Sequence, residues 1–228
     1  MLYSTSCTHR DQLPRLSNGL VFTISPKHLT SVSEGYSRDN AIAIFPPYTM
    51  ATLLLQSYES NVDHLCRILH IPTVRSLIKS VYLRIPLNEP IPPGEAALLL
   101  SVFAISAYFY LPHPDCDIAR TKEDAINLSK TLSKSALDVL DYSRRNSSGT
   151  LEDSQAYILM AFVTYHLDGF SARGRLLSTA ALSIARELRL HRLDADESSK
   201  PESETTVCAV IEQEVKRRVF WHIAASDW

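Results

Sequence analysis

The stretch AALLLSVFAISAYFYL, residues Ala96–Leu111, decides the fold because it is apolar on nearly every side of a helix. A surface helix carries one apolar stripe, whereas a helix without a polar face lies inside a bundle. The run is shorter than the roughly 20 residues that a membrane span needs, and serine and tyrosine interrupt it. It therefore predicts the central helix of a bundle. Pro93 and Glu95 suit the start of this helix, where no N–H is needed and a negative charge is favourable.

Amphipathic segments precede this central stretch. Apolar residues recur at steps of three and four over residues 48–69, which predicts one helix of about six turns that Pro72 ends. A shorter helix follows through Leu77 and Tyr82 and is broken by Pro86. Neither segment shows the alternation of a β-strand, so both belong to the helical part of the chain.

Helix-start signals mark three further helices. Thr121 with Asp124, and Thr150 with Asp153, each place an acidic residue three positions after a threonine, which is the spacing of a capping arrangement. Ser171 is suited to cap the helix that follows, since a serine side chain can accept a hydrogen bond from a first-turn N–H. The chain after residue 48 therefore predicts helices joined by short polar loops.

The two ends of the chain differ from its middle. Residues 1–47 are rich in serine, threonine and proline and predict an irregular N-terminal arm, in which Leu20–Ile24 and Ala41–Phe45 can dock as extended segments. Residues 48–228 predict an all-α domain, a multi-helix bundle. Its last helix begins near Val207 and reaches residue 228 without a stop signal, so we expect this domain to be incomplete at its C-terminal end.

The charge of the chain does not favour direct DNA reading. Lysine and arginine number 23 against 25 acidic residues, for a formal net charge of −2. Electrostatic binding to DNA needs a basic face that neutralises phosphates. Basic residues form only short clusters, at Arg144–Arg145, at Arg173 with Arg175, and at residues 216–218, and a solvated helix face explains each of them. We do not expect direct DNA binding by this chain alone.

The sequence contains no recognisable motif for catalysis, cofactor binding or metal binding. A zinc hydrolase places two histidines four residues apart on one helix face, whereas His64 and His70 are six apart and lie on different faces. A glycine-rich phosphate loop, a nucleophile elbow and a dinucleotide fingerprint are also missing from the sequence. We therefore expect no enzymatic activity and no cofactor.

One loop does contain residue types that bind metals in other proteins: His113, Asp115, Cys116 and Asp117. Neighbouring residues rarely all reach one ion, so a polar loop before a helix start is the simpler interpretation. Asp115 and Asp117 also invite comparison with all-α isoprenoid enzymes, whose paired carboxylates hold magnesium and diphosphate. Those carboxylates share one helical face at spacings of three or four, which this loop does not provide. Such an enzyme is the weakest of the hypotheses.

The four cysteines, Cys7, Cys66, Cys116 and Cys208, lie far apart in the sequence. A zinc module that reads DNA needs closely spaced cysteine pairs, so these cysteines do not predict one. Residues 1–10 are polar and do not form a secretory signal. The cysteines are therefore expected to be reduced thiols of an intracellular protein.

Two segments together resemble a known family. The first spans Gly174 to Arg192 and ends in ARELRLHR, and the second is EVKRRVFW, residues 214–221, with Asp227 six positions further on. This helix end, an acidic loop and the second motif are similar to the middle homology region of fungal zinc-cluster transcription factors. A looser similarity extends upstream to Pro46.

The resemblance implies an all-α region, the fungal-specific transcription factor domain, that regulates an activator in the nucleus. It implies contacts with protein partners of the transcription machinery. In that family the region lies downstream of a six-cysteine zinc cluster, which is missing from this sequence. The resemblance therefore does not extend to DNA binding or dimerisation.

The motif residues have structural interpretations first. Glu214 is spaced to pair with Arg217 or Arg218 on a helix surface, and Trp221 and Phe220 are expected in the core, because large aromatic residues dominate burial. A functional interpretation is that Arg217, Arg218 and Asp227 shape a regulatory surface. Arg186 is a candidate for the same ion-pair network, and His191 is expected to end its helix. The motif residues with structural or regulatory roles are Arg186, His191, Glu214, Arg217, Arg218, Trp221 and Asp227.

A second hypothesis comes from a different class of protein. Helical bundles can hold a ligand between helices, so the chain would also suit a small-molecule-responsive sensor. A sensor predicts thermal stabilisation by its ligand, whereas a regulator that acts through protein contacts predicts altered target transcripts.

Overall fold

The computed structural model describes residues 19–24, 41–112, 118–193, 195 and 206–226. Within these ranges the chain is predominantly helical, which confirms the all-α prediction, and the strands form one small sheet. The elements in chain order are β1 (Leu20–Ile24), β2 (Ala41–Phe45), α1 (Tyr48–Asn61), α2 (Asp63–Cys66), α3 (Ile71–Arg84), α4 (Pro93–Tyr108), α5 (Lys122–Asn146), α6 (Leu151–Asp168), α7 (Ala172–Glu187), the 3₁₀ helix η1 (Leu190–Arg192) and α8 (Val207–Ser226).

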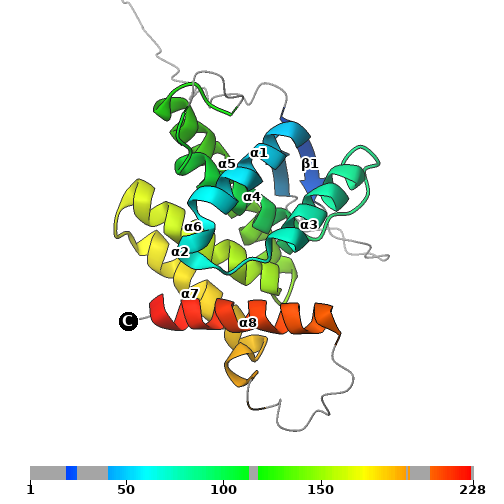
Figure 1. Ribbon diagram of the computed structural model, residues 1–228, viewed down its shortest axis with the longest axis vertical. Helices are drawn as coiled ribbons and strands as arrows, with labels where there is room; N and C mark the ends of the chain where they lie inside the picture. Colours follow the sequence, from blue (N-terminus) through cyan, green and yellow to red (C-terminus); the bar gives the residue numbers. More distant parts are fainter. Residues whose placement is uncertain (1–18, 25–40, 113–117, 194, 196–205, 227–228) are drawn as a thin grey trace, which may run out of the picture.

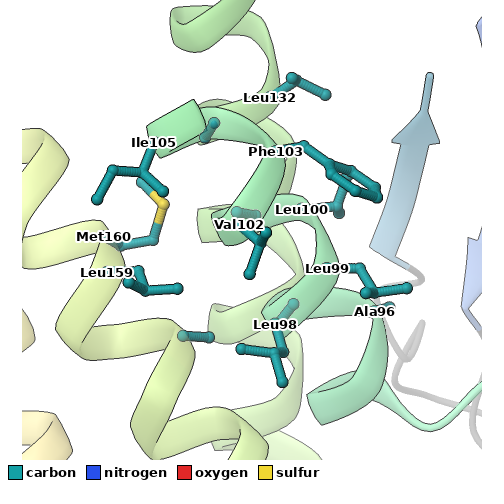
Figure 2. Close-up of a cluster of buried hydrophobic side chains, with 14 of the residues drawn as sticks. Ala96, Leu98, Leu99, Leu100, Val102, Phe103, Ile105, Leu132, Leu159 and Met160 are labelled. Carbon is teal, nitrogen blue, oxygen red and sulfur yellow. The ribbon is translucent and has the colours of Figure 1, made fainter. Parts of the chain in front are cut away.

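Helix α4 is the centre of the bundle, as its sequence predicts (Figure 1). Every residue from Ala96 to Ala107 is buried, and α1, α5 and α6 pack around the helix. Figure 2 shows Leu132 of α5 and Met160 of α6 beside the α4 side chains. The apolar surface of α4 is thus covered by protein. In the described part of the chain, no helix combines the length and the apolar character that crossing a membrane requires.

Strands β1 and β2 pair antiparallel, with Leu20 opposite Phe45 and Ile24 opposite Ala41. The extended segments expected in the N-terminal arm therefore form a sheet. Strand β2 packs against α5, where the N–H of Ile44 donates to Ser135 Oγ at 2.9 Å. Alternate residues of β2 are buried, so the sheet covers part of the helical core. The division into an arm of residues 1–47 and a helical domain of residues 48–228 stays a prediction.

The single helix predicted over residues 48–69 is wrong in its length. Helix α1 ends at Asn61, the short α2 follows, and Arg67 then adopts a left-handed backbone with φ of 49°. This turn points Ile68 into the core, and its carbonyl accepts a hydrogen bond from Gln155 Nε2 at 2.7 Å. Pro72 lies in the first turn of α3 instead of ending a helix, because a missing N–H costs nothing there.

Both predicted capping boxes are present. In each, the aspartate N–H donates to the threonine Oγ1, and the threonine N–H donates to an aspartate Oδ2. Ser171 caps α7, since its Oγ accepts from the N–H of Gly174 at 3.2 Å. The two boxes differ in one respect: Asp124 is exposed, whereas Asp153 is only 1% exposed.

This difference predicts unequal costs for removing the two threonine hydroxyls. Thr150→Ala should lower the free energy of unfolding by about 2–3 kcal/mol, because the carboxylate of the buried Asp153 loses one of its hydrogen bonds. Thr121→Ala should cost about 1 kcal/mol, because water reaches Asp124. Urea unfolding of both variants measures the difference. Equal costs would contradict the role assigned to the burial of Asp153.

Candidate functional site

Helix α8 carries most of the family-motif residues and lies at the edge of the molecule, where it packs on α6, α7 and η1 (Figure 1). Its buried side is a narrow stripe of Val215, Val219 and Ile223. These residues are four apart, so they lie on one face of the helix. The opposite face of α8 is turned away from the bundle and is the first candidate site.

The outward face of α8 is partly apolar. Val207, Val210 and Trp221 lie on it and are 75%, 53% and 61% exposed. Val207, Val210, Glu214 and Trp221 follow one another at steps of three, four and seven residues. This spacing places all four on the same side of the helix. We call Val207, Val210, Glu214, Arg217, Arg218 and Trp221 the α8 outer face.

An ion-pair cluster lies in the middle of the α8 outer face. Arg217 Nη1 lies 2.8 Å from Glu214 Oε2, and Arg218 Nε lies 2.8 Å from Glu214 Oε1. Hydrogen bonds from Arg218 and then from Arg217 hold the pKa of the Glu214 carboxyl below its usual range. Exposed pairs of this kind contribute about 0–1 kcal/mol each to stability. The cluster therefore contributes mainly two arginines and one glutamate in fixed positions, with a net charge of +1.

The expectation that Trp221 lies in the core is wrong, whereas Phe220 is partly buried against the core. The buried stripe includes Val219 and Ile223, and Trp221 is two positions from each, which rotates it by about 200° to the solvent side. The residue type suggested that Trp221 is buried, but its angular position relative to the buried stripe of α8 places it on the solvent side.

The structure places the remaining motif residues apart from this cluster. Arg186 is exposed on α7, and no ion pair joins it to Glu214 in the described part of the chain. His191 lies in η1, with its ring centroid 6.3 Å from that of Phe220. Asp227 lies outside the described residues. The motif thus brings together Glu214, Arg217, Arg218 and Trp221, but not Arg186.

A second candidate site is a cleft of about 720 Å³ between α5 and α7. Both helices pack on α6, which leaves the space between them open. Leucine, alanine and isoleucine side chains of α5 and α7 line it together with polar and charged side chains of the same helices, and Asp153 near the start of α6 is also part of the lining. Sequence patterns within single helices gave no sign of this cleft, because it depends on the distance between two of them.

Within the described part of the chain, the remaining candidate residues for chemistry form no site. The loop with His113, Asp115, Cys116 and Asp117 lies outside the described residues, as does Cys7. Among the residues that the structure describes, no three histidine, cysteine, aspartate or glutamate side chains are placed to hold a metal ion. Cys66 is buried and Cys208 is exposed, both as free thiols, and burial raises the pKa of the Cys66 thiol to about 11.

Fold and motif together define an all-α domain of the kind that regulates transcription. The chain belongs to the family of the fungal specific transcription factor domain, which matches residues 55–223. That range includes the second motif through Trp221 and the whole of α4, and the resemblance predicted from the sequence is confirmed.

Three fungal relatives are named as transcription factors. The chain is 42% identical over 184 residues to the probable transcription factor lepB of Aspergillus flavus, a match that covers 80% of this chain and 33% of the relative. It is 31% identical over 185 residues to the transcription factor TAS2 of Pyricularia oryzae, covering 80% of this chain and 23% of the relative. The agnestins biosynthesis cluster transcription factor AgnL11 of Paecilomyces divaricatus is 29% identical over 187 residues, covering 82% and 27%.

The chain spans a third or less of the length of these relatives. No solved structure matches the chain. The comparisons therefore establish the family and a regulatory, transcription-factor-like region.

Proposed function

We propose that this chain is a regulatory region that works in the nucleus and acts through protein contacts made by the α8 outer face. The observation that carries the proposal is the 61% exposure of Trp221 beside a fixed arginine–glutamate cluster. Tryptophan and arginine are among the residues most enriched at binding hot spots, and contiguous exposed apolar surface marks interaction sites more than a single exposed residue does. Trp221 shares its helix face with the exposed Val207 and Val210, whereas Phe170 lies outside this face.

The charges of the helices favour protein over DNA as the partner. Arg217 and Arg218 are both paired with Glu214, and Lys216 lies 2.5 Å from Glu212 Oε1. Arg144 is likewise paired with Asp141 at 3.2 Å. A surface that reads DNA directs its arginines to phosphates and base edges, whereas these basic groups already have carboxylate partners on their own helices.

A tethered reporter tests the proposal. The chain is fused to a heterologous DNA-binding domain in a fungal host, and transcription of a reporter with the matching operator is measured. Trp221→Ala should change reporter output at least about fivefold, because losing a hot-spot contact costs about 2 kcal/mol or more. Phe170→Ala is the matched control, since Phe170 is an aromatic residue that is 96% exposed but lies outside α8.

Two further measurements complete this test. Thermal unfolding of both variants should be close to that of the parent chain, because each side chain is mostly exposed. A fluorescent tag on the chain should give a stronger nuclear than cytoplasmic signal. Equal reporter output from Trp221→Ala and the parent chain would refute the role of the α8 outer face.

A further inference from the structure

We propose that the cleft between α5 and α7 binds a small amphipathic molecule with an apolar body and a hydrogen-bond donor group, either neutral or cationic. This site is separate from the α8 outer face, and its occupancy can be measured without any transcription assay. A bound molecule of this kind would make the region responsive to a small effector.

The dimensions and walls of the cleft fit an organic ligand. Small-molecule sites usually have volumes of about 300–1,000 Å³ and mostly apolar walls, and this cleft measures about 720 Å³. Leu137 and Leu140 line it from α5, and Leu177, Ala180 and Ile184 line it from α7. These side chains would contact the apolar body of the ligand.

One buried polar atom of a residue that lines the cleft lacks a well-formed hydrogen bond. Asp153 is 1% exposed, and its Oδ2 accepts hydrogen bonds from the Thr150 N–H at 2.9 Å and from Thr150 Oγ1 at 3.0 Å. Its Oδ1 makes no hydrogen bond of ordinary geometry among the described residues. Burial raises the pKa of this carboxyl, and the neighbouring Ser143 and Thr150 side chains oppose that rise. A buried acceptor is costly while it stays unpaired, so this atom favours a donor group in the cleft.

The charged residues around the cleft favour the same class of ligand. Asp138, Asp141, Asp153 and Glu187 line it together with only two basic residues, Arg144 and Arg173. Arg144 is already paired with Asp141. A cleft with an acidic excess attracts a cation or a neutral donor and repels a carboxylate.

Three ten-carbon probes that differ only in the head group test this proposal on the 228-residue chain. Decan-1-amine carries a cationic donor, decan-1-ol a neutral donor, and decanoate an anion without a donor at neutral pH. The two ionic probes are titrated below their micelle concentrations and the alcohol below its solubility limit, and each titration is followed by methyl NMR. The amine and the alcohol should shift the methyl signals of Leu137, Leu177 and Ile184, while Ile78 in α3 stays unchanged. Decanoate should bind at least about tenfold more weakly than the amine.

Two matched substitutions separate the role of Asp153 in binding from its role in capping. Asp153→Asn keeps an oxygen for the capping box but replaces the second oxygen with a donor, so the affinity for the amine should fall at least about tenfold. Asp124→Asn makes the same change in the exposed capping box of α5 and should leave the affinity unchanged. Ala180→Phe fills the cleft and should reduce binding of all three probes.

Three results would overturn the proposal. The first is that none of the probes shifts the signals of the cleft methyl groups. That result would favour a protein segment, and not a small molecule, as the occupant of the cleft. The second is equal affinity for amine and decanoate, which would indicate nonspecific apolar adsorption. The third is an equal effect of Asp153→Asn and Asp124→Asn. None of these results bears on the reporter test of the α8 outer face, so the two proposals fail independently.

Discussion

Replacing Phe103 with alanine is expected to lower the free energy of unfolding by about 3–5 kcal/mol. Phe103 is fully buried in α4 (Figure 2), and α1, α5 and α6 pack around this helix. The loss combines the transfer of the aromatic ring to water in the unfolded chain with the cavity left in a closely packed core. A domain of this size is stable by only about 5–15 kcal/mol, so the variant would lose a large part of its stability.

Urea unfolding followed by circular dichroism measures this change. Leu83→Ala is the control, because Leu83 is a large apolar residue that is 69% exposed on α3. We expect this control to change stability by less than about 0.5 kcal/mol. If both variants lost the same amount, or if Phe103→Ala lost less than about 1 kcal/mol, α4 would not be the centre of the core.

The parts of the fold that could be predicted from the sequence are those with a local physical cause. Helix α4 is apolar all round, and only burial on every side satisfies such a helix. Both capping boxes involve side chains and N–H groups three residues apart, so a short motif contains all the partners. The Glu214 ion pairs also lie within one helix turn and follow from spacing alone.

The features missed from the sequence depend on tertiary contacts. The break between α1 and α3 is stabilised by the hydrogen bond from Gln155 to the Ile68 carbonyl, and these residues are 87 positions apart. The apolar spacing continues through the break, so periodicity gives no signal for it. The cleft between α5 and α7 arises from the way both helices pack on α6. The position of Trp221 depends on which stripe of α8 faces the bundle, and residue type does not decide that.

The narrow buried stripe of α8 leads to the second large prediction. Val219→Asp should detach α8 from the bundle while α1 to α7 stay folded. Val219 is fully buried, and α8 is held mainly by this residue together with Val215 and Ile223. An aspartate there would place an unpaired polar group in an apolar contact, at a cost of several kcal/mol, whereas α4 makes no substantial contact with α8. Local release of α8 costs less free energy than unfolding of the whole bundle, so we expect α8 alone to detach.

Hydrogen exchange distinguishes local release from global unfolding. In Val219→Asp, amide protection over residues 207–226 should fall by about 100-fold or more, while protection of α4 stays within about threefold of the parent chain. Ala225→Asp introduces the same charge at an exposed position of α8 and should leave both regions protected. An equal loss of protection in α4 and α8 would show that α8 is part of one cooperative unit with the core. If α8 is released as expected, the α8 outer face loses its fixed orientation, and Val219→Asp should then reproduce the reporter change of Trp221→Ala while the bundle stays folded.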